Sequence, residues 1–181
     1  HEALRRTLGK HVIQKGSFVG PDKLRFDFSH VKPIDESEIK KIEKYVSDMV
    51  KSSSTVKTRL MSPKEAVEKG ALALFGEKYA DEVRVLSMGD EKNKYFSTEL
   101  CGGTHVRNTS EIGNFKIVSQ SAIASGVRRV EALRSEQLKN YLERKKKDSQ
   151  DLHKVISDKI NNLADEIKSL GEQPVDTINL P

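Results

Sequence analysis

Hydrophobic and polar positions alternate with two different periods along the first three quarters of the chain. Apolar residues every three to four positions predict a helix over residues 1 to about 12 and a second helix capped by Asp35. Ser62-Pro63 and Gly70 mark the start and end of a short third helix. Period-two alternation predicts strands over residues 14–19, 23–29, 55–60, 83–88, 115–120 and 127–133.

The connections between these elements are rich in turn-forming residues. Residues 89–94 are polar and predict the tip of an extended hairpin, while the small residues of 121–126 predict a loop between the last two strands. The first helix has no cap before His1 and the sequence has no initiator methionine, so we expect a processed or truncated piece.

After Ser135 the pattern changes to that of one long helix. Its apolar residues are spaced 4, 3, 4 and 3 apart, which is the seam of a coiled coil, and Gly171 ends it. A narrow stripe of this kind predicts self-association through residues 152–170, although folding back onto the body is the simpler alternative. The stripe consists of Ile156, Ile160, Leu163, Ile167 and Leu170.

The predicted fold class is α+β, with a mixed or antiparallel sheet, packed helices and a long C-terminal coiled-coil-like helix. The expected organisation is a body over residues 1–134, the helix over 135–171, and a linker over 172–181 toward a further domain.

Composition and charge narrow the class of protein only slightly. The net charge is +5, and residues 1–134 hold 24 basic and 18 acidic side chains, which suits a polyanion but also suits an ordinary lysine-rich surface. No apolar run approaches the ~20 residues of a membrane span. The single cysteine, Cys101, fits a reducing compartment, so we expect a cytoplasmic protein without membrane contact.

The segment Cys101-Gly-Gly-Thr-His105 carries the clearest chemistry. A diglycine turn lets the thiolate and the imidazole converge, and both are usual ligands of tetrahedral zinc. Zinc needs four ligands, or three with a water molecule. No two of the other histidines (His1, His11, His30 and His153) have the helical spacing that would complete the site.

The motif CGGTH, preceded by FSTEL and followed by GVRRVEAL, resembles the editing domain of alanyl-tRNA synthetases. The segments HEALRRTLGKHVIQKGS, LRFDFSH, KGALALFGEKY and VRVLSMGD are similar to that family in the same order and cover most of residues 1–134. Residues 91–95 depart from the usual pattern and look like a short insertion.

The resemblance implies a tRNA-editing domain that hydrolyses seryl or glycyl esters on tRNA for alanine in a zinc-dependent way. In the family, zinc is held by an H-x3-H pair on a helix and by the C-x3-H pair, here Cys101 and His105. The helix pair would lie upstream of His1, so His1 itself is not expected to be a ligand. ATP and magnesium would belong only to an aminoacylation domain outside this chain, so we expect this piece neither to charge tRNA nor to be active alone.

Further site residues follow from the resemblance and from position. Gln14 and Lys15 match pocket-lining positions, and Thr104 could contact a substrate serine or merely satisfy its turn. Glu99 would share a strand face with Cys101 and could orient a ligand, or could be an exposed strand residue. One of the pair Arg128 and Arg129 is expected to meet the tRNA end.

Competing interpretations remain at this level. A free-standing trans-editing deacylase would use the same chemistry, but the long helix favours a synthetase. The related threonyl editing domain is disfavoured by the GGT and GVRRVEA sequences. A non-catalytic RNA-binding or dimerisation module would lack the H-x3-H helix upstream of His1.

Overall fold

A computed structural model describes residues 1–72, 79–90 and 95–173 of the chain. It confirms the α+β fold class, with antiparallel sheets, packed helices and a long C-terminal helix. Two compact units are present, residues 1–138 and residues 139–181. Within the described ranges no helix is both long and apolar enough to cross a membrane.

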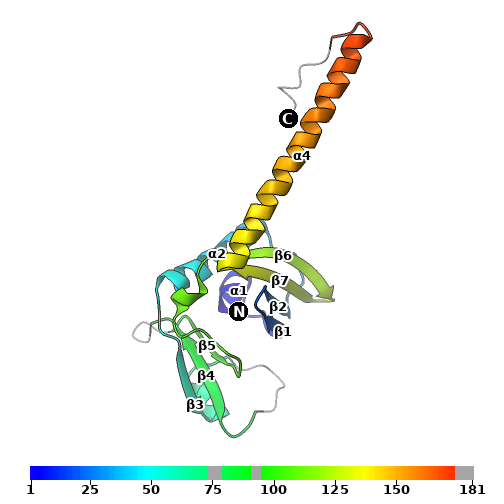
Figure 1. The fold of residues 1–181 in the computed structure, drawn as a ribbon. Coiled ribbons are helices and arrows are strands. Elements are labelled where there is room, and N and C mark those ends of the chain that lie inside the picture. The colour runs from blue at the N-terminus through cyan, green and yellow to red at the C-terminus, as the bar shows by residue number, and fades with distance from the viewer. Residues whose placement is uncertain (73–78, 91–94, 174–181) are drawn as a thin grey trace. The chain divides into compact units, whose positions relative to one another are not determined.

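A four-stranded antiparallel sheet with the order β1-β2-β7-β6 forms the first layer of residues 1–138 (Figure 1). Alternate residues of its central strands face a hydrophobic core, and Phe26 pairs with Val130 there. Helices α1 and α2 contribute Leu4 and Ile42 to the same core, in which Phe28 is completely buried. The elements are α1 (Glu2–Leu8), β1 (Gln14–Val19), β2 (Leu24–Ser29), α2 (Glu36–Lys51), β6 (Phe115–Ala124) and β7 (Val127–Arg134).

The start of α2 confirms the predicted cap. The carboxylate of Asp35 accepts a hydrogen bond from the amide of Glu38, and the Glu38 side chain accepts one from the amide of Asp35. This reciprocal arrangement satisfies two amide groups that the first helical turn would otherwise leave unpaired.

A second, three-stranded antiparallel sheet has the order β3-β4-β5 and a small core of its own. Met61, Val83 and Val85 from the strands pack there with Ala66 from α3. The sheet consists of β3 (Lys57–Met61), β4 (Val83–Met88) and β5 (Ser97–Leu100). In the sequence, α3 (Pro63–Glu68) lies between β3 and β4, and the 3-10 helix η1 (Thr109–Ile112) follows β5.

Several predicted boundaries are wrong. The first helix ends at Leu8, not near residue 12, because Gly9 adopts a φ of 119° and turns the chain. The predicted loop 121–126 is mostly strand, since β6 continues to Ala124 and pairs with β7 there; Gly126, with a φ of 70°, makes the turn. Residues 91–94 of the predicted hairpin tip lie outside the described residues, as do 174–181 of the predicted linker.

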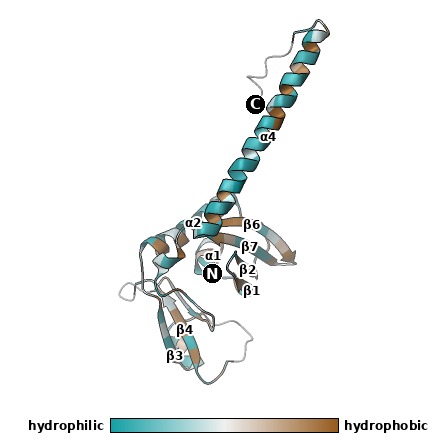
Figure 2. Cartoon of the chain, viewed as in Figure 1, coloured by the Kyte–Doolittle hydropathy of each residue, from teal (hydrophilic) through white to brown (hydrophobic). Residues whose placement is uncertain are grey.

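Helix α4 (Ser135–Ser169) confirms the long C-terminal helix. Figure 2 shows it as mostly hydrophilic, with hydrophobic residues at intervals. Ile156, Ile160 and Leu163 are exposed by 48%, 39% and 58%, so within the described residues the apolar stripe has no cover.

On the other side of the four-stranded sheet, Asp27 and Arg129 form a bidentate ion pair. The Arg129 Nε and Nη2 atoms donate to the two Asp27 carboxylate oxygens at 2.6 and 2.8 Å, and Asp27 is only 6% exposed. The hydrogen bond from Arg129 holds the pKa of Asp27 below its ordinary value, against the opposing effect of burial.

Replacing Asp27 by asparagine is expected to lower the free energy of unfolding at pH 7 by about 1.5–3 kcal/mol, because Arg129 loses a charged partner. A depressed carboxylate pKa contributes stability above the unfolded-state pKa of about 3.9, and this stability is lost as the pH falls through the folded-state value. The difference between wild type and variant should therefore shrink below about pH 4. Urea unfolding at pH 7 and pH 3 measures it, with the exposed Asp81→Asn as control. A constant difference across pH would contradict the assignment.

Candidate functional site

The CGGTH segment leaves the end of β5 and is fastened to β4 by one arginine. The amide of Cys101 donates to the Arg84 carbonyl at 3.1 Å, and Arg84 Nε donates to the Cys101 carbonyl at 2.8 Å. The Arg84 guanidinium also donates to the Gly103 carbonyl. The loop is thus held by its carbonyl groups, which leaves its side chains free to converge.

The side chains of Cys101 and His105 do converge, as the motif predicts. His105 Nε2 lies 3.1 Å from Cys101 Sγ. Tetrahedral zinc with ordinary Zn–S and Zn–N bonds separates such atoms by about 3.5 Å, so a small adjustment suffices for both to bind one ion. Burial, and then the positive charge of Arg84, lower the pKa of His105 against an opposing effect of Glu99. A neutral imidazole is the form that binds metal.

The two glycines leave room around the Cys101–His105 pair, and a Cβ would meet nothing within 4 Å at Gly102 and only ordinary contacts at Gly103. A Cβ on Gly103 would lie 3.7 Å from Cys101 Sγ and 3.9 Å from His105 Nε2, against the face where the pair would hold a ligand. Toward the described part of the chain, the amides of Gly102 and Gly103 donate no hydrogen bond. Two free N–H groups beside a nucleophile or metal are suited to receive a developing oxyanion.

A cavity of about 340 Å³ opens beside this loop. That volume is within the range of small-molecule sites. Its lining is mainly apolar and includes Gln14 from β1, Glu99 from β5 and Cys101 with Gly102 from the loop. His1, Leu72, Tyr79, Val83, Arg84 and Leu100 complete the lining.

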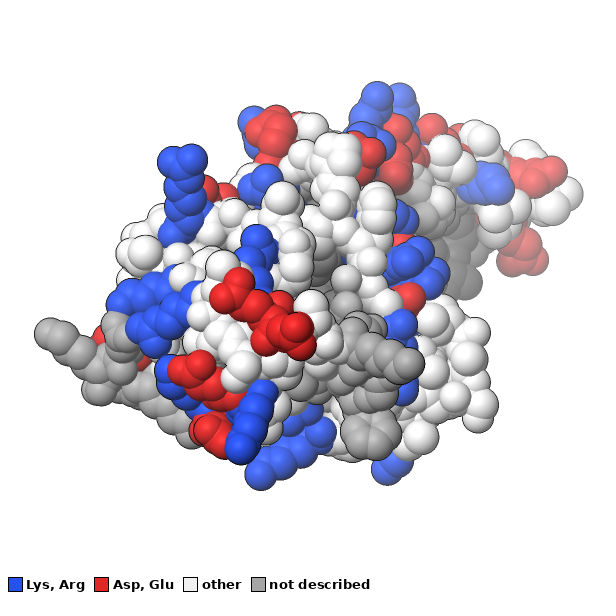
Figure 3. Space-filling model, turned by 90° about the horizontal axis from the view of Figure 1, so that it is seen from below, with Lys and Arg blue, Asp and Glu red and all other residues white. Residues whose placement is uncertain are grey.

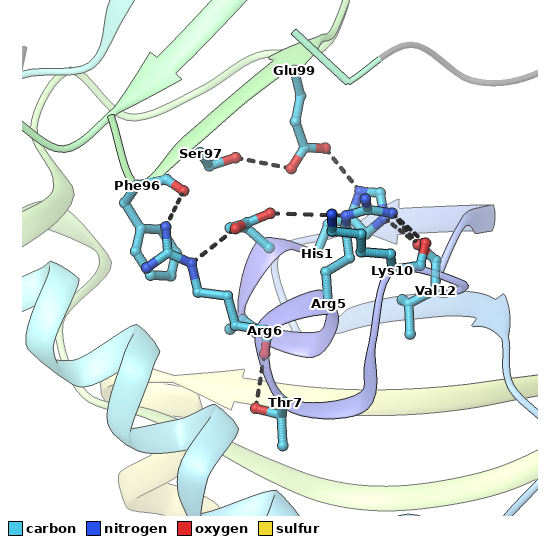
Figure 4. A network of polar contacts seen from close by, with 11 residues as sticks. His1, Arg5, Arg6, Thr7, Lys10, Val12, Phe96, Ser97 and Glu99 are labelled. Atoms are coloured by element: carbon cyan, nitrogen blue, oxygen red, sulfur yellow. Dashed lines mark hydrogen bonds and ion pairs between the residues drawn. The ribbon is translucent and has the colours of Figure 1, made fainter. Parts of the chain in front are cut away.

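Glu99 is held at the cavity by His1 (Figure 4). His1 Nδ1 lies 2.9 Å from Glu99 Oε2, and Ser97 Oγ donates to Glu99 Oε1 at 2.9 Å. Burial opposes ionisation of Glu99, but the hydrogen bonds and the charge of His1 outweigh it, and the pKa of Glu99 is lowered. Glu99 thus orients His1, and within the described part of the chain it forms no hydrogen bond or ion pair with Cys101 or His105.

His1 has no nitrogen to offer a metal in this arrangement. Its Nε2 lies 3.3 Å from the Val12 carbonyl oxygen while Nδ1 faces Glu99, and its side chain is only 5% exposed. That His1 is not a zinc ligand stays a prediction.

The three residues predicted to be catalytic are not gathered in one place. Gln14 lines the cavity, whereas Lys15 is exposed at a bulge of β1 and Thr104 is exposed on the loop, and neither belongs to the lining. Their catalytic roles stay predictions.

The consecutive arginines of β7 point in opposite directions. Arg129 pairs with Asp27, and Arg128 Nη2 donates to Gln120 Oε1 at 3.0 Å. His11 and His30 form a surface pair, with Nε2 of the first 2.8 Å from Nδ1 of the second.

Sequence reasoning missed the lining residues Arg84, Tyr79 and His1 as part of the cavity. Arg84 stands between the apolar residues Val83 and Val85 of β4, and a charged residue at the partly buried position of a strand is the signal that could have singled it out.

The residues around the loop provide only part of a zinc site. In the described ranges no group of three or more histidine, cysteine, aspartate or glutamate side chains could hold a metal ion, so Cys101 and His105 supply two ligands of the usual four. Two ligands chelate an ion but do not enclose it.

The 181-residue chain alone is therefore expected to hold zinc weakly and to carry much less than one ion per chain after dialysis. Elemental analysis and competition with a chromophoric chelator measure this, with Cys101→Ser as the comparison. One tightly held zinc per chain would contradict the prediction and redirect attention to His1 and His11.

Comparison with known proteins defines the family of this site. Residues 83–131 match the family described as the threonyl and alanyl tRNA synthetase second additional domain. These residues are therefore similar to that domain. β4, β5 and the whole CGGTH loop lie inside the match, which ends near the end of β7.

The surroundings of the second additional domain are also similar to a tRNA ligase. The chain is 58% identical over 145 residues to the alanine–tRNA ligase of Parvibaculum lavamentivorans. That alignment includes 78% of the chain but only 16% of the ligase, so the chain spans about a sixth of this relative's length. The resemblance to the editing-domain region of alanyl-tRNA synthetases is thereby confirmed.

Proposed function

We propose that residues 1–138 hydrolyse the ester of serine or glycine wrongly attached to tRNA for alanine. The observation that carries the proposal is the cavity beside the CGGTH loop, lined by Cys101, Gly102 and Glu99, within a domain shared by two synthetases. A pocket for alanine rejects slightly different amino acids poorly by binding alone, so a second hydrolytic site is the physical remedy.

In this reaction, water adds to the ester carbonyl carbon and the bond to the ribose oxygen breaks. The ribose oxygen takes a proton, and the products are a free amino acid and a tRNA with its terminal hydroxyl restored. The amides of Gly102 and Gly103 suit the oxyanion formed on the way. Arg84 holds the loop beside them by donating to the carbonyls of Cys101 and Gly103.

Zinc fits the Cys101 and His105 pair as an incomplete site. When bound by a full ligand set, it would supply Lewis-acid chemistry or hold the substrate. The chain's own groups would still bind, orient and enclose the ester.

The parent protein is proposed to be an alanine–tRNA ligase that acts in the cytoplasm on tRNA for alanine. ATP and magnesium would serve its aminoacylation domain. Self-association through residues 152–170 belongs to the same proposal, because the exposed stripe of α4 suits another helix.

The test is deacylation of seryl-tRNA for alanine, with correctly charged alanyl-tRNA as the comparison. It should be run on the 181-residue chain and on a chimera that adds the preceding segment of the Parvibaculum ligase. The chimera should bind zinc and hydrolyse the seryl ester preferentially, while the shorter chain does so slowly. A chimera that binds tRNA but hydrolyses neither ester would favour a non-catalytic RNA-binding module.

A further inference from the structure

Helix α4 carries its charge and its apolar residues in different halves. Residues 139–147 hold five basic side chains and one acidic side chain, whereas residues 148–169 hold three basic and five acidic. The apolar stripe lies in the second half, and no large apolar residue occurs between Leu142 and Leu152. We call the basic group of the first half the basic collar: Lys139, Arg144, Lys145, Lys146 and Lys147.

The collar side chains are exposed and lack acidic partners. None of them forms an ion pair with any residue of the described ranges. Some basic residues elsewhere form ion pairs, as Lys40 does with Glu36 and Lys44 with Asp48, but the collar differs in placing four consecutive basic residues together. On the face drawn in Figure 3, lysine and arginine side chains likewise lie close to aspartate and glutamate. Unpaired cations crowded on two to three helical turns repel one another, and a polyanion relieves that repulsion.

We propose that the basic collar binds the phosphate backbone of a double-stranded RNA stem. Nine helical residues span about 13 Å. Phosphates of one strand of B-form DNA follow one another at about 3.4 Å along the axis, and those of an A-form RNA stem lie closer together, so the collar has room for at least three of them. The choice of RNA over DNA rests on the proposed function, whereas the backbone contact itself follows from the charges.

The residues around the collar favour an RNA stem over the other large polyanion, an anionic membrane. A helix that lies on a membrane needs a broad apolar face beside its basic residues. Around the collar only Leu142 is an exposed large apolar residue, and the Tyr141 ring lies under the Lys145 ammonium at 5.7 Å. Because the apolar stripe begins later, the collar also stays accessible when residues 152–170 are paired.

The test is binding of a short RNA duplex that carries no esterified amino acid to the 181-residue chain, followed by fluorescence anisotropy at several salt concentrations. Lys145→Glu with Lys146→Glu is expected to weaken binding roughly 10- to 100-fold near 0.1 M salt and to reduce the salt slope by about two. The control, Lys154→Glu with Lys168→Glu, makes the same charge change on the same helix outside the collar and should weaken binding less than about 3-fold.

Equal weakening by both variants, or none by either, would overturn the proposal. So would binding of phosphatidylserine vesicles that depends on the collar while RNA binding does not. Circular dichroism checks that the Lys145→Glu, Lys146→Glu variant keeps its helix. If helix is lost, the charge-neutralising pair Lys145→Gln with Lys146→Gln is used in its place. This experiment contains no aminoacyl ester, so it tests RNA binding by the collar independently of the proposed ester hydrolysis.

Discussion

Replacing Cys101 by alanine in the chimera is expected to lower the rate of seryl-tRNA hydrolysis by at least about 100-fold. Cys101 is one of the two converging side chains that we propose as zinc ligands; it lines the cavity, and its Sγ lies 3.1 Å from His105 Nε2. Its loss would remove metal affinity and the anchor of the loop side chains together. The backbone contacts to Arg84 use main-chain atoms of Cys101, so the fold of the loop should survive.

The measurement is single-turnover hydrolysis of seryl-tRNA, with zinc content and thermal unfolding recorded on the same samples. His105→Ala should behave like Cys101→Ala. His153→Ala removes a histidine on α4 and should leave the rate unchanged. Hydrolysis by Cys101→Ala at the parent rate would show that ligation by this thiolate is not required.

The second large effect is expected on self-association. Ile160→Asp with Ile167→Asp should convert a self-associating chain into a monomer, because each large side chain of the stripe is worth roughly 1.5 to 3 kcal/mol when buried. Ile160 is 39% exposed within the described residues, and Leu163, between the two substituted positions, is 58% exposed.

Sedimentation equilibrium decides this, with Asn161→Asp and Asn162→Asp as a control pair. The control adds the same two negative charges to α4 between the two substituted positions, but away from the stripe. It should associate like the wild type. A monomeric wild type at high concentration would rule out pairing and favour a stripe that folds back on its own chain.

Sequence patterns predicted most of the fold because local signals and burial agree. Asp35 and Glu38 form the capping box that begins α2, and the 4-3-4-3 spacing gives α4. Prediction failed where strand pairing gives a segment of loop-like amino-acid composition a β conformation. Ser121 and Ala122 have the small side chains of a loop, yet they lie in β6 because Arg129 and Arg128 of β7 supply their ladder partners.

The candidate site was predictable where one segment carries it and not where distant segments meet. Cys101 and His105 are four residues apart, so a turn brings them together. The contact of His1 with Glu99 joins residues 98 positions apart, and no local pattern signals such a pair. The partner of Arg84 is a backbone carbonyl, which leaves no trace in the side-chain pattern.

Helix α1 has only seven residues, but it touches both sheets. Its Leu4 is buried in the core of the four-stranded sheet, while Arg6 donates to the Phe96 carbonyl at 3.0 Å and lies 4.1 Å over the Phe96 ring. His1, the residue that caps it, contacts Glu99 on β5. His1 and Arg6 therefore link the β5 side of the cavity to the four-stranded sheet through polar contacts, so we expect fraying of α1 to release Glu99 and open the cavity before either sheet separates its strands.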